Sequence, residues 1–252
     1  MRRLLPTPGD EGTTDVYDDL VLAGPAEGRS AVSLGMVSSV DGGATVAGRT
    51  ADLGGEADQA AFGALRAAAD AILVGAGTVT AEDYGPGAGS AERRRRRLRK
   101  GLAASPRLAI VTNRLSLRPD ARVFGEPDHP PLLITTEQAV ADRPEVAGRG
   151  EVVVCGDEQV DLPTALQALA ERGLGRVLCE GGPGLNASLF AEDLVDEVFL
   201  TLAPTLVGGD APRIIAVAGT HVPRPLELLA LREHDSELLL HYGVVRQSAD
   251  RL

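Results

Sequence analysis

The chain has 252 residues, of which 44% are hydrophobic and only 3% aromatic, and its formal net charge is −11. Such an acidic chain repels phosphate backbones and offers few rings for base stacking, so a nucleic-acid partner is disfavoured. No apolar run is long enough to cross a bilayer and the only cysteines, Cys155 and Cys179, end apolar runs, so we expect a cytoplasmic protein without membrane contact or a disulfide scaffold. The length suits a single domain over residues 1–252, with residues 1–28 extended or poorly structured.

From Ala31 onward, short apolar runs alternate with Ala/Leu-rich segments of helical period. This alternation predicts strands and helices around a mainly parallel sheet. The predicted strands are Ala31–Val37, Ala71–Val74, Leu108–Val111, Pro131–Thr135, Glu151–Val154 and Arg176–Cys179. The clearest predicted helices are Glu56–Ala69 and Leu162–Arg172, the second closed by Gly173.

The pattern changes after Asp196. Glu197–Ala203 is predicted to be a strand, and Leu226–Arg232 and Glu237–Val245 are predicted to form a hairpin around the turn His234-Asp235-Ser236. Because α/β sheets commonly carry antiparallel strands at an edge, the sequence predicts one mixed sheet and not a second domain.

Two glycine-rich turns follow predicted strands. Gly181-Gly182-Pro183-Gly184 comes after Arg176–Cys179 and leads into a helical segment that begins with Leu185-Asn186. Gly75-Ala76-Gly77 comes after Ala71–Val74, and Thr78 can cap the following helix, which includes Glu82. Backbone amides in such turns can bind a pyrophosphate, although each turn alone could be merely a tight connection. Neither turn has the G-x-G-x-x-G spacing, so a Rossmann-type NAD dehydrogenase is disfavoured.

Polar side chains at other strand ends extend this interpretation. Thr112 and Arg114 follow Leu108–Val111, and a guanidinium there suits a ribose 2′-phosphate, which favours NADPH over NADH, although an exposed arginine can equally be only solvated. Glu180 ends a strand against a glycine turn, where its carboxylate could hold an aminopyrimidine or pteridine edge, relay a proton, or only interact with a helix dipole. Asp41 is predicted to cap the Gly42-Gly43 turn.

Residues 85–100 form a low-complexity stretch that is predicted to be a loop or a ragged helix start. It contains the run Arg93–Arg97. Such charge blocks are usually solvated, and a phosphate-binding role is the alternative.

Several segments taken together resemble one known family. They are Ser39–Gly42, Phe62–Arg66, Ala69–Val79, Glu180–Leu185, Asp196-Glu197 and Ala203-Pro204. In this order they are similar to the reductase domain of bacterial riboflavin biosynthesis, which has the dihydrofolate reductase fold. The resemblance implies a three-layer α/β fold with a mainly parallel central sheet and antiparallel C-terminal strands.

The resemblance also implies a homodimer that uses NADPH to reduce the imine form of a 5-amino-6-ribosylaminouracil 5′-phosphate to a ribitylamine. It places the contacts to NADP at Ser38, Asp52, Thr78, Glu82, Thr112 and the turn from Gly182 to Asn186. It places the contacts to substrate at Thr50, Arg66 and Glu180, of which Glu180 is the candidate catalytic residue.

The chain departs from the family pattern at two cationic positions. Gly35 stands where the family has a lysine, and Tyr84–Gly87 stands where it has Pro-x-Leu-Thr-x-Arg. The family's zinc-binding deaminase motif is absent from this sequence, so we expect reduction alone and no metal. Because the lost cations bear on the substrate, dihydrofolate reduction and a non-catalytic NADPH-binding protein remain alternatives to pyrimidine reduction.

Overall fold

The computed structural model describes residues 1–13, 16–17, 19–46, 48–50, 52–86, 91–126, 129–216 and 223–246. Its strands are β1 (Arg2–Leu5), β2 (Gly9–Asp10), β3 (Ala31–Ser39), β4 (Ala71–Gly75), β5 (Arg107–Val111), β6 (Leu132–Thr135), β7 (Glu151–Val154), β8 (Arg176–Cys179), β9 (Glu197–Ala203), β10 (Leu226–His234) and β11 (Glu237–Val244). Its α-helices are α1 (Glu56–Ala68), α2 (Ala76–Ala81), α3 (Ala91–Arg99), α4 (Glu137–Asp142), α5 (Pro144–Ala147), α6 (Leu162–Glu171) and α7 (Pro183–Ala191).

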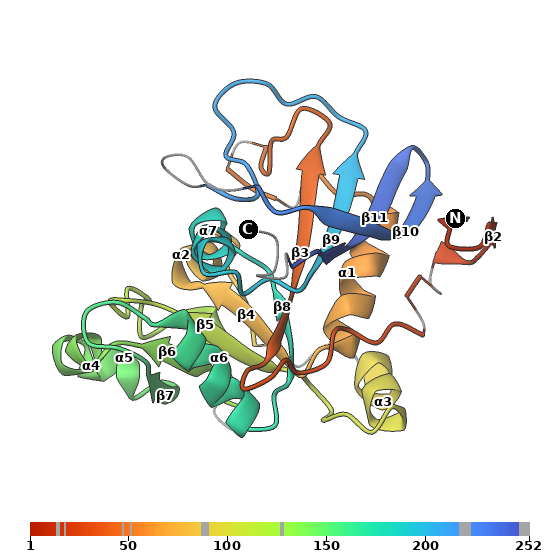
Figure 1. Cartoon of the computed structure of the whole chain (residues 1–252). Coiled ribbons are helices and arrows are strands. Elements are labelled where there is room, and N and C mark those ends of the chain that lie inside the picture. The colour runs from red at the N-terminus through yellow and green to blue at the C-terminus, as the bar shows by residue number, and fades with distance from the viewer. Residues whose placement is uncertain are drawn as a thin grey trace, which may run out of the picture.

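The strands of the described residues form a single sheet in the order β2-β1-β10-β11-β9-β3-β8-β4-β5-β6-β7. From β9 to β7 every neighbouring pair is parallel, and from β2 to β9 every pair is antiparallel. In Figure 1 this order runs from β2 at the right to β7 at the lower left. The predicted mixed sheet is therefore confirmed, with β3, β8 and β4 near the middle of the whole sheet.

Helices cover both faces of the sheet. On one face, Leu73 and Val177 pack in one core cluster with Leu166 of α6 and Leu189 of α7. On the other face, α1 packs on Leu178, while α2, α4 and α5 pack on β4, β5 and β6. Because side chains alternate between the two faces of a strand, the nearly continuous apolar runs of β4 and β8 are buried on both sides. The three-layer α/β architecture follows.

Local sequence accounts for several boundaries. The Asp161 side chain accepts the Thr164 N–H at 2.8 Å and caps α6, and Gly173 follows that helix with φ of +75°. At the β10–β11 hairpin, Asp235 and Ser236 have φ of +47° and +70°. This is the conformation that a tight two-residue hairpin requires, so the predicted turn is confirmed.

One open prediction is decided, and another was wrong. Of the two alternatives for residues 85–100, a loop or a ragged helix start, the structure has a helix, α3, while residues 87–90 lie outside the described residues. The Asp41 carboxylate does not cap its own turn. It accepts the N–H groups of Val207 and Gly208, and the Ser39 hydroxyl accepts the Gly43 N–H instead. Asp41 therefore connects the turn after β3 to the loop after β9. Its carboxylate also accepts the Ser39 hydroxyl, and this bond, followed by those from Gly208 and Val207, lowers the pKa of Asp41 to about 2.

The N-terminal residues join the antiparallel end of the sheet. β1 pairs with β10, and the buried Tyr17 ring packs edge-on against Phe199 of β9 with ring centroids 5.5 Å apart. No helix among the described residues is long and apolar enough to span a bilayer.

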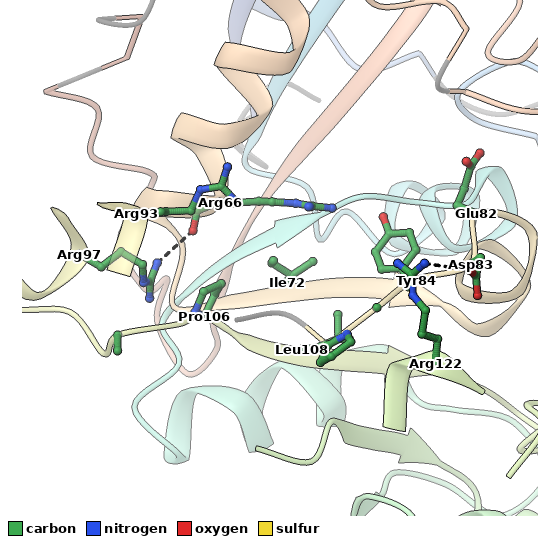
Figure 2. A pocket seen from close by; sticks show the side chains of 13 residues that line it. Arg66, Ile72, Glu82, Asp83, Tyr84, Arg93, Arg97, Pro106, Leu108 and Arg122 are labelled. Carbon is green, nitrogen blue, oxygen red and sulfur yellow. Dashed lines mark hydrogen bonds and ion pairs between the residues drawn. The ribbon is translucent and has the colours of Figure 1, made fainter. Parts of the chain in front are cut away.

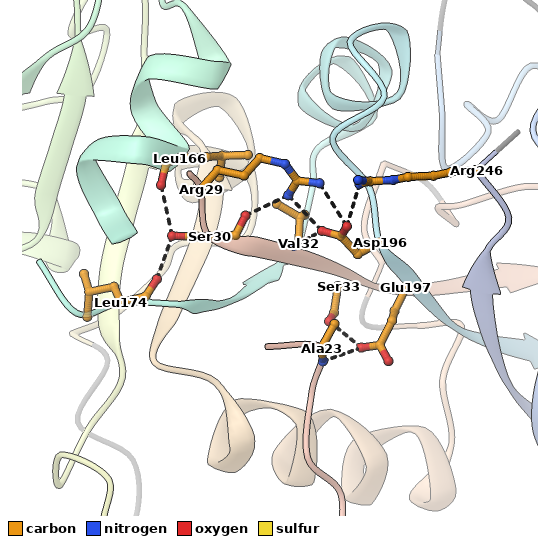
Figure 3. Close-up of polar contacts among 10 residues, drawn as sticks. All are labelled: Ala23, Arg29, Ser30, Val32, Ser33, Leu166, Leu174, Asp196, Glu197 and Arg246. Atoms are coloured by element: carbon orange, nitrogen blue, oxygen red, sulfur yellow. Dashed lines mark hydrogen bonds and ion pairs between the residues drawn. The ribbon is translucent and has the colours of Figure 1, made fainter. Parts of the chain in front are cut away.

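Asp196 fastens the amino-terminal ends of β3 and β9. Its carboxylate accepts hydrogen bonds from both Arg29 Nη atoms at 2.9 Å, from the Val32 N–H at 2.8 Å and from Arg246 Nη2 at 2.6 Å (Figure 3). Glu197 beside it accepts the Ser33 hydroxyl at 2.9 Å. These bonds lie at the sheet edge opposite the carboxyl ends of the parallel strands, so the acidic pair has a structural role.

Candidate functional site

The central parallel strands β3, β8 and β4 end side by side, and the two predicted glycine turns meet there. The Gly75 N–H donates to the Gly181 carbonyl at 2.7 Å, and the Glu180 N–H donates to the Leu73 carbonyl at 2.9 Å. Gly181 has φ of +87°, and the peptide bond between Gly181 and Gly182 is cis. Both turns therefore belong to a single site at the carboxyl edge of the sheet, where α/β proteins bind ligands.

Glu180 lies at the centre of this edge and accepts hydrogen bonds from two side chains. Arg66 of α1 donates from Nε to Oε1 and from Nη2 to Oε2, each at 2.6 Å. The Tyr84 hydroxyl donates to Oε2, also at 2.6 Å. The Glu180 side chain is 1% exposed, whereas that of Arg66 is 33% exposed. A two-point guanidinium–carboxylate pair fixes orientation as well as charge, so Glu180 is held rigidly.

This arrangement sets the protonation states of its members. Burial opposes the charge of Arg66, but the hydrogen bonds and the charge of Glu180 outweigh it and raise the pKa of Arg66 above its usual range. Burial and the neighbouring Glu180 charge raise the pKa of Tyr84 well above its usual range. Arg66 is therefore a permanent cation and Tyr84 a permanent neutral donor at physiological pH.

A cavity of about 520 Å³ opens above this edge. It lies between the carboxyl end of β3, α1, the two glycine turns and residues 212–214. The Arg66 guanidinium forms part of the cavity wall. Its Cζ lies 5.2 Å from the Phe62 ring centroid and 5.8 Å from the Tyr84 ring centroid. A cavity of this size with an apolar ring and a fixed ion pair can hold a small planar ligand.

The glycine turns leave room for a ligand close to the backbone. A Cβ at Gly182 would lie 2.6 Å from the Thr78 hydroxyl oxygen, so the turn after β8 and the start of α2 can approach only because this residue is glycine. A Cβ at Gly77 or Gly184 would meet no atom within 4 Å. The first amides of α7 have no acceptor within their helix, so this edge suits the phosphates of a nucleotide.

Predicted contacts to cofactor and substrate meet in this cavity. Its lining includes Thr50, Arg66, Gly77, Thr78, Glu82, Glu180, Gly181, Gly182 and Pro183. Glu82 also accepts the Thr50 N–H at 3.0 Å, which holds the segment before α1 against α2.

Other predicted contacts lie outside the lining. They are Ser38, Asp52, Gly75, Thr112, Arg114, Gly184, Leu185 and Asn186. Asp52 and Arg114 are exposed, and Ser38 and Thr112 are buried. Asn186 is fully buried, and its amide donates to the Ile214 carbonyl at 2.8 Å. This bond positions a wall of the cavity.

Sequence reasoning assigned no role to Tyr84, Phe62 or Met36, which also line the cavity. Tyr84 was noted only as part of a departure from the family pattern. The only local signal is an aromatic residue two positions after Glu82, close to the end of the helix that carries Thr78, and nothing in that spacing shows that its hydroxyl reaches a carboxylate 96 positions away.

Comparison with known proteins agrees with this geometry. Residues 30–240 match the family model described as RibD C-terminal domain. The 2,5-diamino-6-ribosylamino-4(3H)-pyrimidinone 5′-phosphate reductase of Methanothermobacter thermautotrophicus is 32% identical over 188 residues, covering 74% of this chain and 83% of that protein. The riboflavin biosynthesis protein RibD of Chlamydia muridarum is 32% identical over 176 residues, which are 66% of this chain and 45% of that longer protein.

Solved structures show the same fold. A pyrimidine reductase-like protein from Corynebacterium diphtheriae superposes with a TM-score of 0.80 and 25% identity, covering 94% of this chain and all of that one. The yeast riboflavin biosynthesis reductase Rib7 superposes with a TM-score of 0.66 at 19% identity, covering 92% of this chain and 100% of that one. The expected dihydrofolate reductase-like fold is confirmed. Reductases of this family imply a nucleotide cofactor.

Proposed function

The chain belongs to the RibD C-terminal domain family, and from that premise we propose that it is an NADPH-dependent reductase of a ribosylaminopyrimidine 5′-phosphate. The observation that carries the proposal is the Arg66–Glu180 pair in the wall of a cavity that also includes both glycine turns. It supports the proposal because a carboxylate that can accept from a pyrimidine lies beside glycine turns that suit a nucleotide.

A bound nicotinamide would supply the hydride that reduces the C=N bond of the substrate. The chain would hold the phosphates of the dinucleotide with the backbone amides of the turn after Gly181 and of the first turn of α7. Thr78 and Glu82 line the same cavity and are the polar side chains we assign to the cofactor on α2 and just after it.

Glu180 would bind and orient the pyrimidine. A carboxylate offers about four acceptor positions, and Arg66 and Tyr84 occupy three of them. The remaining position on Oε1 can accept a ring N–H or an exocyclic amine. Because Glu180 is held as an acceptor and the raised pKa of Tyr84 makes its hydroxyl a poor acid, we assign the proton for the reduced nitrogen to water.

The direct test is NADPH oxidation by the purified protein with the diaminopyrimidinone and the aminouracil forms of the ribosylamino phosphate offered separately. Turnover of either one supports the proposal, and the ratio of kcat/KM values identifies the natural form. Absence of turnover with both, under conditions where a RibD enzyme is active, overturns it. Dihydrofolate belongs in the same assay, because its reduction would favour the pterin alternative.

We also propose that the protein is a homodimer. Leu226, Leu228 and Leu229 of β10 are 36–44% exposed, and β1 covers this strand only from Leu231 onward. The apolar strand edge fits a second copy of the chain. Sedimentation velocity of the wild type and of Leu228→Glu tests this, and a monomeric wild type would contradict it.

A further inference from the structure

A second cavity of about 360 Å³ lies on the other side of Arg66. Figure 2 shows Arg93 and Arg97 of α3 on one side of it and Tyr84, Asp83 and Arg122 on the other. The two cavities share Arg66, Glu82, Tyr84 and Arg93 in their linings. A ligand held by Glu180 therefore has a neighbouring compartment into which a second group can extend.

Positive charge dominates the second compartment. Four guanidinium groups line it, against two carboxylates, and Asp83 already pairs with Arg122 at 3.0 Å. Arg97 is 1% exposed and donates to carbonyl oxygens at the end of α1, while the charge of Asp70 offsets the cost of its burial only in part. With the Arg66–Glu180 and Arg122–Asp83 pairs counted, guanidinium groups still outnumber the carboxylates that face this compartment, and such an excess of positive charge favours an anion.

Arg93 brings its charge close to Arg66. Its Nη2 lies 3.1 Å from the position that a Cβ on Gly63 would occupy, so the guanidinium rests against the glycine backbone of α1. Burial, and next the positive charge of Arg66, lower the pKa of Arg93. Burial likewise lowers the pKa of Arg97 to about 10. Because burial disfavours the charged form of both arginines, an added negative charge beside them would be stabilised.

We propose that this compartment binds the phosphate monoester of the pyrimidine substrate, with Arg66 and Arg93 as its direct ligands. Arg66 uses two of its five N–H donors on Glu180 and can direct the others to a phosphate, so one side chain would contact both the ring-binding carboxylate and the phosphate. Arg97 would hold α3 against the C-terminal end of α1 and thereby fix the position of Arg93. The basic run would thus be a specificity element and not a solvated segment.

The inference rests on the proposed reductase function, and the test separates the two. KM and kcat are measured for the phosphorylated substrate and for its dephosphorylated nucleoside, in the wild type, in Arg93→Gln and in the control Arg95→Gln. Arg95 lies on the exposed face of the same helix. We expect Arg93→Gln to raise KM for the phosphate about 10- to 100-fold with little change in kcat, and to leave the nucleoside unaffected.

Binding gives a readout independent of turnover. Ribose 5-phosphate titrated into the NADPH-loaded protein should bind the wild type and Arg95→Gln equally and Arg93→Gln at least about tenfold more weakly. Arg93→Lys keeps the positive charge but loses the two-point donor geometry of the guanidinium, so its affinity for ribose 5-phosphate should be intermediate. This variant replaces Arg93→Gln if the glutamine variant does not fold. Equal KM and equal ribose 5-phosphate affinity in wild type and Arg93 variants would overturn the inference while the reductase stands. No turnover of either substrate by the wild type removes the proposed function itself.

Discussion

Arg66 and Glu180, 114 positions apart, meet through two hydrogen bonds of 2.6 Å that join α1 to the carboxyl end of β8. The pair connects the two cavities, because Glu180 lies in the first and Arg66 lines both. Changes at either residue should therefore affect substrate binding in both compartments.

Replacing Glu180 with Gln should lower kcat/KM about 100-fold or more, because it breaks the buried charge pair that orients the pyrimidine. The amide cannot accept from Arg66 at both atoms, and its NH2 group faces either Arg66 or Tyr84, both of which are donors. We also expect a loss of roughly 1–3 kcal/mol in the free energy of unfolding. Steady-state kinetics and urea denaturation measure the two effects. Glu171→Gln, on the exposed end of α6, is the control, and a Glu180→Gln enzyme with near-normal kcat/KM would contradict the assigned role.

Gly182→Ala should weaken NADPH binding about tenfold or more, because the new Cβ would lie 2.6 Å from the Thr78 hydroxyl and push α2 away from the turn after β8. The matched double variant Gly182→Ala/Thr78→Ala removes that oxygen. It should regain thermal stability without regaining full cofactor affinity, since Thr78 itself lines the site. Thermal unfolding and fluorescence titration with NADPH separate the two. Equal affinity in the wild type and the single variant would show that the close approach is not needed for binding.

Much of the fold could be predicted because its signals are local. Strands such as Ala71–Gly75 are buried on both faces and therefore appear as continuous apolar runs, and glycines at their ends mark the turns. Glu180 could be identified as a site residue because it directly follows such a strand and precedes a glycine turn. The periodicity of apolar residues and the glycines at strand ends were sufficient to predict these elements.

The remaining features depend on contacts between distant segments. The arginine run gives no periodic apolar signal, so neither α3 nor the burial of Arg97 could be predicted from it. The hydrogen bond from Tyr84 to Glu180 and the tie from Asp41 to the loop at Val207 likewise depend on which strands become neighbours. Local patterns contain no information on such pairings.

Arg97→Met should destabilise the protein by roughly 2–4 kcal/mol. The Arg97 guanidinium donates to the carbonyls of Arg66, Ala67 and Ala69. It therefore provides hydrogen-bond donors to the last carbonyls of α1 and places a positive charge at the negative end of the helix dipole. Methionine keeps much of the volume but leaves these carbonyls without the donor. Chemical denaturation measures the loss, and Arg95→Met on the exposed face of α3 should change stability by less than about 0.5 kcal/mol. Equal stability of the two variants would show that the buried guanidinium is not a helix cap.

The stability of the protein should fall as the pH rises from about 10 to 12 because of Tyr17. Burial, the largest effect, raises the pKa of Tyr17 to about 12 even though Arg232, whose guanidinium carbon lies 4.6 Å from the ring centroid, opposes the shift. The unfolded chain ionises near pH 10, so the stabilisation is complete below that pH and is lost as the pH passes through the folded-state pKa. Its size is of the order of 2 kcal/mol. Urea denaturation between pH 8 and about 11.5 should show this decline in the wild type, and Tyr17→Phe, which cannot ionise, should show a flatter profile. Parallel profiles for the two proteins would assign the decline to other groups.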